Sequence, residues 1–437
     1  MVKKDSVYIR NVEIPLHLDR DVKRWDILIV DGVIKKIAPS GEGRAPDGVP
    51  DFNGEGFQAS AGFIEMHAHL RYPGQTYRED LVSGSRAAAR GGFTSVVTMA
   101  NTNPPVDNAE IVTNIINRAQ AEDCVVAIYP VGAVTMGQKG EHLTDFLGLK
   151  KAGVIALSDD GMPISNSKLM VDALKLSRTY GMLLMLHEED KNLSNENIIR
   201  EGEISYELGI PGYHSFSEEL MVIRDLHLCE KIGGRIHFCH VSSRYSLPHL
   251  AAAKAMGLSV TAEVTPHHLY LTSEALRSYD PNYKMSPPLG HPEDQEALLT
   301  ALREGIIDCV ATDHAPHAYH EKDLLLADAN CGITGLETAF GVLCDLVRAR
   351  KLTLDRVLTA LTSEPAGILG LEKKGRLEEG CDGDVVLFKA DEPWIYKRDE
   401  VMSKSLNSPF LEKQLYGRIR ATFVGGSLVY DGDKGGL

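Results

Sequence analysis

The sequence predicts an α/β fold: a closed (β/α)8 barrel of the TIM type, joined to a small composite β domain from both termini. Eight short apolar runs follow one another, and most are separated by stretches with helical spacing, such as residues 79–90, 108–120 and 168–180. Strands that alternate with helices form a parallel sheet, and eight such units close into a barrel. The expected strands are residues 63–70, 95–101, 125–131, 154–160, 183–187, 235–240, 259–265 and 307–313.

The two ends of the chain lack this alternation and carry short strand patterns instead. These strands are expected at residues 6–14, 25–30, 32–38, 384–388, 419–424 and 427–430. Helical spacing follows the eighth barrel strand, at residues 335–349, 354–361 and 365–369. We therefore expect residues 59–370 to form the barrel, and residues 1–58 and 371–437 to form the composite β domain together.

Two long connections interrupt the barrel pattern. Residues 189–217 are polar and are expected to form an elaborated loop after the fifth strand. Residues 316–334 follow the eighth strand, and a connection of this length is typical of a lid over a site.

The composition excludes several classes of protein. A hydrophobic fraction of 43% and a mean hydropathy of -0.14 are typical of a soluble globular protein. No apolar run reaches the roughly 18 residues that span a bilayer, so we expect no membrane partner. The net charge of -15, without a basic cluster, argues against nucleic acid. Seven scattered cysteines favour reduced thiols in a cytoplasmic protein over a disulfide framework.

Histidine and aspartate, both common metal ligands, close five of the eight expected strands. His67 and His69 lie two residues apart, so the alternation of a strand points both side chains to one face. Catalytic groups of barrel enzymes lie at the C-terminal ends of the strands. The other candidates at those ends are Asp159 or Asp160, His187, His240 and Asp313.

Four histidines and two carboxylates predict a metal-dependent enzyme with two divalent ions of the zinc class. One carboxylate must bridge the ions. Alternation lets only one of Asp159 and Asp160 face the barrel axis, and the residues alone barely separate them. His237 is expected to point to the opposite side of its strand from His240 and to be an ordinary core histidine.

Six motifs follow one another between about residue 55 and residue 370. They are His67-Ala68-His69-Leu70-Arg71-Tyr72-Pro73-Gly74, Asn101-Thr102-Asn103-Pro104-Pro105, Ser158-Asp159-Asp160-Gly161, Cys239-His240-Val241-Ser242-Ser243, Val264-Thr265-Pro266-His267-His268 and residues 312–317. Together they resemble the dihydroorotase branch of the amidohydrolase superfamily. The first two are the most specific. Many superfamily members have a carboxylated lysine at the position of Asp160, so this chain resembles the aspartate-bridged class I type, which selects Asp160 over Asp159.

The resemblance implies a role for each candidate. Two zinc ions per subunit are implied, with Asp160 as their bridge; one is held by His67, His69 and Asp313, and the other by His187 and His240. The implied reaction is the reversible hydrolysis of L-dihydroorotate to N-carbamoyl-L-aspartate in de novo pyrimidine biosynthesis, with Asp313 moving the proton. Substrate contacts are implied at His69, Arg71, Asn103, Ser286, His317, Cys331 and Gly332.

Two of these contacts have alternatives. Arg71 suits a substrate carboxylate because a guanidinium offers a planar fork, although it could instead form a salt bridge at the rim. His317 could be a zinc ligand, but the ions already have ligands, so we expect it to contact the substrate.

Two positions depart from the family pattern. Ser286 stands where the family usually has asparagine, in a segment that ends in Gly290 instead of arginine, and Asn330-Cys331-Gly332 stands where it often has Pro-Phe-Gly. An allantoinase or hydantoinase-type cyclic amidase therefore remains an alternative. A second alternative is an inactive structural partner of aspartate transcarbamoylase, which the six intact ligand candidates disfavour. We also expect a homodimer, with a possible association with aspartate transcarbamoylase.

Overall fold

The computed structural model describes residues 5–434, except residues 18, 20, 42 and 196. Eight strands form one sheet whose neighbours follow the order of the chain. The sheet closes because Ala68 and His314 form a parallel bridge, in which the His69 N–H donates to the His314 carbonyl at 2.9 Å. The predicted (β/α)8 barrel is confirmed. Its strands are β6 (Phe63–Ala68), β7 (Phe93–Thr98), β8 (Ala127–Gly132), β9 (Ala156–Leu157), β10 (Leu183–Leu186), β13 (Arg235–Phe238), β14 (Val260–Val264) and β15 (Cys309–Val310).

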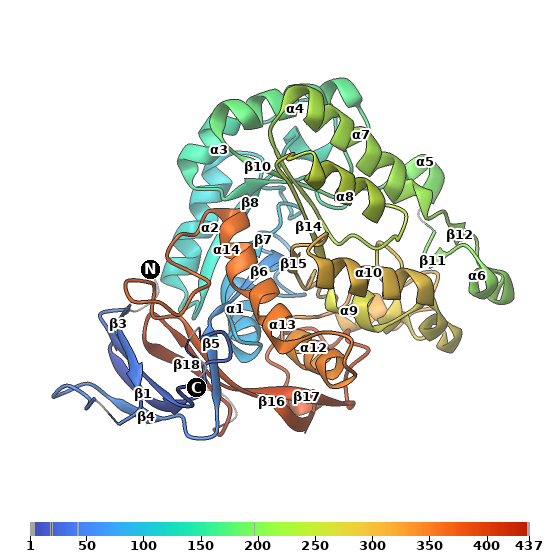
Figure 1. Ribbon diagram of the computed structural model, residues 1–437. Helices are drawn as coiled ribbons and strands as arrows, with labels where there is room; N and C mark the ends of the chain where they lie inside the picture. Colours follow the sequence, from blue (N-terminus) through green and yellow to red (C-terminus); the bar gives the residue numbers. More distant parts are fainter. Residues whose placement is uncertain (1–4, 18, 20, 42, 196, 435–437) are drawn as a thin grey trace.

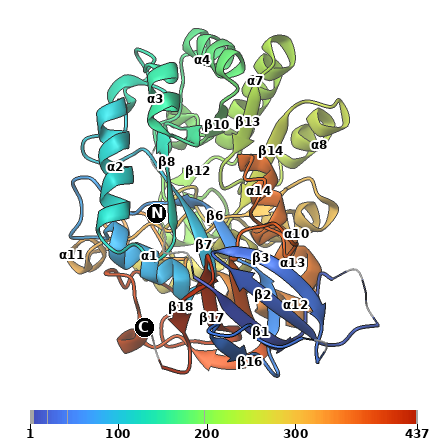
Figure 2. The ribbon, with the colours of Figure 1, turned by 90° about the vertical axis from the view of Figure 1, so that its left-hand side faces the viewer.

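Helices surround the barrel (Figures 1 and 2). The ends of α4 show why they form where they do: the Asn166 side chain accepts the N–H groups of Lys168 and Leu169, and Gly181, with a φ of 64°, ends the helix. The helices are α1 (Leu81–Arg90), α2 (Ala109–Ala121), α3 (Phe146–Ala152), α4 (Ser167–Tyr180), α7 (Phe216–Ile232), α8 (Leu247–Ala255), α9 (Pro266–Tyr270), α10 (Pro292–Glu304), α11 (Tyr319–Lys322), α12 (Ala339–Arg348), α13 (Leu354–Leu361) and α14 (Ser363–Leu369).

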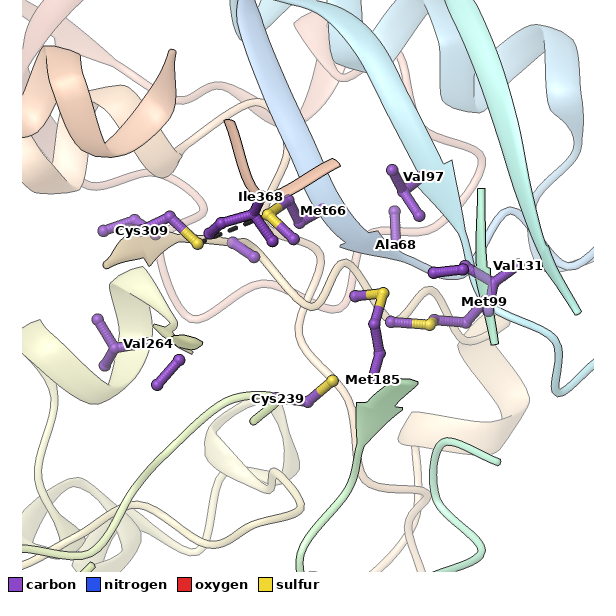
Figure 3. Close-up of a cluster of buried hydrophobic side chains, with 14 of the residues drawn as sticks. Met66, Ala68, Val97, Met99, Val131, Met185, Cys239, Val264, Cys309 and Ile368 are labelled. Atoms are coloured by element: carbon purple, nitrogen blue, oxygen red, sulfur yellow. Dashed lines mark hydrogen bonds between the residues drawn. The ribbon is translucent and has the colours of Figure 1, made fainter. Parts of the chain in front are cut away.

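Apolar and sulfur-containing side chains fill the barrel interior (Figure 3). Met66 and Cys309 meet across the β6–β15 seam, with their sulfur atoms 3.6 Å apart. Methionine side chains adapt to irregular gaps and leave few voids.

The two ends of the chain form two four-stranded sheets beside the barrel (Figures 1 and 2), which confirms the composite β domain. Val385 of β16 pairs with Ala61 of β5, so the two ends share one sheet. The strands are β1 (Val7–Val12), β2 (Trp25–Val30), β3 (Val33–Pro39), β4 (Asp51–Asn53), β5 (Gln58–Ala61), β16 (Val385–Ile395), β17 (Gln414–Val424) and β18 (Ser427–Asp431). Residues 1–4 and 435–437 lie outside the described residues, and the domain boundaries stay a prediction.

The connection of residues 189–217, expected to be an elaborated loop, has short elements of its own. It contains α5 (Lys191–Ser194), β11 (Ile199–Arg200), α6 (Glu203–Leu208) and β12 (Gly212–Tyr213), and β11 pairs with β12. Ile199 and Ile204 are buried against Leu276 and Leu326. These apolar partners come from distant segments, so the polar local composition could not reveal them. Nowhere in the described residues is a helix long and apolar enough to cross a membrane.

Candidate metal centre

The six predicted ligands come together at the C-terminal end of the barrel, with Asp160 in the middle. Its Oδ1 atom lies 3.5 Å from His67 Nε2, 3.6 Å from His187 Nδ1 and 3.5 Å from His240 Nε2. Its Oδ2 atom lies 3.6 Å from His69 Nε2. One carboxylate therefore faces four imidazoles.

Asp313 completes the cluster from the opposite side of the β6–β15 seam. Its Oδ1 atom lies 3.0 Å from His69 Nε2 and 3.6 Å from His67 Nε2. All six side chains of the cluster are buried. The three-residue groups that could share an ion include His67–His69–Asp160, Asp160–His187–His240 and His67–His240–Asp313.

The spacing between Asp160 and the four imidazoles fits bound cations better than hydrogen bonds. Among the described residues, His67 Nε2 and Asp160 Oδ1 are buried without a hydrogen-bond partner. Separations of 3.5–3.6 Å are too long for good hydrogen bonds. Two ligands at about 2.1 Å from a shared tetrahedral ion stand about 3.4 Å apart. Imidazole and carboxylate donors in this arrangement suit divalent ions of the zinc class.

The two neighbouring aspartates of the fourth strand have different surroundings. Asp159 accepts hydrogen bonds from the N–H groups of Val134 and Thr135 at 2.8 and 3.1 Å, and also from the Thr135 hydroxyl. Asp160 faces the imidazoles; burial alone would raise its pKa, but His67, His187 and His240 hold that pKa well below its usual range. Asp160 is therefore the carboxylate in position to bridge.

A buried carboxylate that the sequence reasoning missed supports two of the ligands. Glu263 Oε1 lies 2.7 Å from His67 Nδ1 and accepts the His240 N–H at 3.2 Å. Its Oε2 lies 3.0 Å from His237 Nε2. His237 is buried and hydrogen-bonded, as expected of a core histidine, but it shares Glu263 with His67 and therefore does not point away from the site. The positive φ of His240, 33°, breaks the alternation on which that expectation relied.

Two further side chains hold ligands in place. Asn101 accepts at 2.8 Å from His69 Nδ1 through Oδ1, and its Nδ2 donates to Asp160 Oδ2 at 3.1 Å. Glu189 Oε2 lies 3.1 Å from His187 Nε2. Asn101 stands in the Asn-Thr-Asn-Pro motif, but the sequence could not show that its side chain contacts the ligands.

Arg71 and His317 lie together beside the metal ligands. Arg71 is 8% exposed, and its Nε donates to the Pro316 carbonyl at 3.1 Å. Burial and the nearby Arg78 lower the pKa of Arg71 to about 10. Its Nη2 lies 3.5 Å from His317 Nε2. A buried guanidinium whose positive charge is poorly compensated is well suited to an anionic ligand.

The lid residues Cys331 and Gly332 pack directly on His317. The Cys331 carbonyl accepts from His317 Nε2 at 2.8 Å, so this nitrogen carries the proton. Burial, Arg71 and Arg78 lower the pKa of His317 to about 3, which keeps the ring neutral. A Cβ at Gly332, where φ is 151°, would lie 2.6 Å from the Ala315 carbonyl oxygen. Only glycine fits there without a shift of the loop.

Comparisons with known proteins place this site in a family. A dihydro-orotase-like family model matches residues 59–246, and an amidohydrolase family model matches residues 245–430. A dihydroorotase of Citrifermentans bemidjiense is 42% identical over 406 residues, covering 93% of this chain and 95% of that protein. A dihydroorotase of Pelotomaculum thermopropionicum is 43% identical over 409 residues, covering 93% and 94%. This chain belongs to the dihydroorotase family.

Membership of the dihydroorotase family makes the chain a hydrolase of the cyclic-amidase class, as predicted. Among solved structures, the L-hydantoinase of Arthrobacter aurescens superposes with a TM-score of 0.86. The match covers 98% of this chain and 96% of that chain at 22% identity, so it establishes the fold alone.

Three residues of this dihydroorotase-family site have a left-handed backbone. The φ angles are 54° at Arg71, 33° at His240 and 45° at Asp313. Such a conformation costs a residue other than glycine about 1–3 kcal/mol, and it persists where the surroundings demand it. Two of the predicted ligands and the predicted anion-binding arginine are thus among the residues with a strained backbone.

Two predicted substrate residues lie further from the ligands. Asn103 is exposed, and within the described part of the chain its side chain makes no hydrogen bond to the ligand cluster. Its backbone packs on Gly74, where a Cβ would lie 1.8 Å from the Asn103 carbonyl oxygen. Ser286 is half-buried, next to Pro287, whose carbonyl accepts from His268 Nε2 at 3.1 Å.

Proposed function

We propose that this protein catalyses the reversible hydrolysis of L-dihydroorotate to N-carbamoyl-L-aspartate, a step of de novo pyrimidine biosynthesis, with two zinc ions. The observation that carries the proposal is the position of Arg71: a buried guanidinium lies beside a cluster of four imidazoles and two carboxylates. His67, His69 and Asp313 would hold one ion, His187 and His240 the other, and Asp160 would bridge. When bound, such ions polarise the scissile carbonyl and make water nucleophilic near neutral pH.

Side chains of this protein carry out the remaining steps, which are substrate binding and proton transfer. Arg71 binds the substrate carboxylate through its fork of N–H groups. Asp313 accepts the proton of the attacking water and passes it to the leaving ring nitrogen. Burial alone would raise the pKa of Asp313, but the imidazoles of His67 and His69 lower it, so the carboxylate is ionised and able to accept. His317 and the backbone at Cys331 and Gly332 enclose the substrate on the lid side.

Ser286 keeps a second candidate open. A serine hydroxyl is shorter than the asparagine amide usual in the family, so it reaches less far toward a substrate, and a neutral ring such as hydantoin or allantoin that does not use this contact becomes a candidate. Arg71 argues for dihydroorotate instead, because a neutral ring has no carboxylate to compensate the buried charge. Asn103, exposed in this structure, would contact the substrate only if its loop moves.

Two wider expectations complete the proposal. The seven cysteines are thiols, which favours a reducing compartment such as the cytoplasm. A homodimer and an association with aspartate transcarbamoylase remain proposals that size-exclusion chromatography, with and without that partner, tests.

A substrate panel tests the proposed activity. The protein is stripped with a chelator, reloaded with zinc, and assayed with dihydroorotate, hydantoin and allantoin. We expect hydrolysis of dihydroorotate that is lost on chelation and returns with zinc, at a kcat/KM well above those of the neutral rings. A higher kcat/KM for hydantoin or allantoin would replace the proposed substrate, and turnover that survives full metal removal would overturn the metal mechanism.

A further inference from the structure

A segment outside the barrel runs across the loops that carry the proposed substrate groups. It comprises residues 403–408, between β16 and β17, and we call it the strap. Asn407 is its central residue and is only 3% exposed. Its Nδ2 donates to the carbonyls of Ala315 and Gly332 at 2.9 and 3.0 Å, and its Oδ1 accepts the His317 N–H at 3.0 Å. One side chain thus joins the His317 loop to the lid.

The backbone of Asn407 strengthens this connection. Its carbonyl accepts the Thr334 N–H at 3.0 Å. The His317 loop in turn holds Arg71, because the Pro316 carbonyl accepts from Arg71 Nε at 3.1 Å. Asn407 therefore binds His317, the residue next to the Pro316 carbonyl that holds Arg71. It also binds Gly332, a proposed substrate contact in the lid.

The first half of the strap holds the loop that follows Arg71. Lys404 Nζ donates to the Thr76 carbonyl at 2.8 Å, and Ser405 Oγ donates to the Arg78 carbonyl at 2.6 Å. The Ser403 hydroxyl donates to Glu79. The strap therefore contacts three loops near proposed substrate groups: residues 76–79, 315–317 and 332–334.

An asparagine suits this place for a chemical reason. The carbonyls of Ala315 and Gly332 both point at one atom, Nδ2 of Asn407, and an amide NH2 offers two donors in one plane. The same amide supplies the acceptor for His317 N–H. Without this amide, the Ala315 carbonyl and the His317 N–H lose this partner, while the Gly332 carbonyl keeps the bond from Lys322 Nζ at 3.2 Å. Leaving a buried backbone group without a partner is costly.

We infer that Asn407 is a positioning residue for catalysis: it keeps the His317 loop and the Gly332 lid in register, so the composite β domain forms part of the catalytic unit. This inference rests on the proposed function. It assigns no chemical step to Asn407, which acts through Arg71, His317 and the lid backbone.

The test compares Asn407→Ala and Asn407→Asp with Ser408→Ala. Asn407→Asp keeps an oxygen that accepts the His317 N–H, but its second carboxylate oxygen replaces the NH2 group and faces the carbonyls of Ala315 and Gly332. Ser408 is buried in the same strap, and within the described part of the chain its side chain bonds only locally, accepting the Phe410 N–H at 3.3 Å, so it is the matched control. The readouts are KM and kcat for dihydroorotate, zinc content, Tm and hydrogen exchange of peptides covering residues 314–318 and 331–335.

We expect both Asn407 variants to raise KM about ten-fold or more, with kcat changed less, zinc content unchanged and faster exchange confined to the two loops. The control should match the wild type in KM and exchange. The inference would be overturned if the Asn407 variants had the KM and hydrogen exchange of the wild type. It would also be overturned if Ser408→Ala raised KM and exchange as much as they do. If the wild-type protein does not hydrolyse dihydroorotate, the proposed function fails, and the exchange measurement still decides whether Asn407 joins the two loops.

Discussion

Glu263 Oε1 lies 2.7 Å from His67 Nδ1, while the same carboxylate's Oε2 lies 3.0 Å from His237 Nε2. A carboxylate that accepts from Nδ1 fixes the proton there and leaves Nε2 of His67 with a lone pair for a cation. His67 Nε2 is the nitrogen that faces Asp160. Glu263 therefore selects the ligating tautomer of His67.

Replacing Glu263 by glutamine should weaken metal binding. The amide oxygen can still accept from His67 Nδ1 and the His240 N–H, but the NH2 group must then face His237 Nε2. We expect zinc affinity to fall about 10- to 100-fold, measured by competition with a chromophoric chelator. Thr261→Val is the matched control, since Thr261 Oγ1 contacts His237 Nδ1 at 2.8 Å and touches no ligand. Equal zinc affinities in wild type and Glu263→Gln would remove this role.

Asp160→Ala and Asp159→Ala should separate metal binding from stability. Asp160→Ala is expected to lose most of the zinc, measured by elemental analysis after gel filtration. Asp159→Ala should keep the zinc and lose about 1–3 kcal/mol of unfolding free energy, because the N–H groups of Val134 and Thr135 lose their acceptor. The opposite pattern would show that Asp159 is the bridging residue.

Asp313→Asn should fold and yet be nearly inactive. The amide cannot accept the proton of the attacking water, and loss of a general base typically costs about 10²–10⁴-fold in rate. Circular dichroism checks the fold, and kcat is measured at saturating zinc so that weaker metal binding does not dominate. A kcat near that of the wild type would exclude Asp313 as the proton shuttle.

Much of the fold could be predicted because its signals are local. The sequence patterns predict the observed bounds of strand β2, Trp25–Val30, and of helix α13, Leu354–Leu361. The predicted strands at residues 384–388 and 419–424 were too short, because β16 and β17 continue by pairing with each other, as in Trp394 with Leu415. Such pairing depends on a partner far along the chain, which local patterns do not contain.

The ligand cluster was predictable for a similar reason, since each ligand ends a strand. Its supports were not: Glu263 lies inside a strand, and its two partners come from β6 and β13. Asn407 lies more than 70 residues from Ala315 and Gly332, the two carbonyls that it binds. Contacts between residues that are far apart in the sequence leave no periodic signal in it.

Acid stability should report on His317. Burial lowers the pKa of His317 to about 3 in the folded protein, from its ordinary value of 6.5. Between these values the unfolded chain binds more protons, so unfolding free energy falls as pH decreases from 6.5 toward 3. His317→Gln should reduce that slope by up to about 1.4 kcal/mol per pH unit, measured by urea unfolding. Identical slopes in both proteins would show that His317 is not held neutral.

The most direct test of the account is the effect of Arg71→Lys on two substrates. A lysine keeps the charge but not the planar fork that binds a carboxylate at two points. We predict that kcat/KM for dihydroorotate falls about 10- to 100-fold. For hydantoin, kcat/KM should change less than about three-fold. If hydantoin turnover is too slow to measure, its inhibition constant is compared instead. An equal fall for both rings, or an unchanged kcat/KM for dihydroorotate, would contradict the assignment of Arg71 to the substrate carboxylate and with it the proposed substrate.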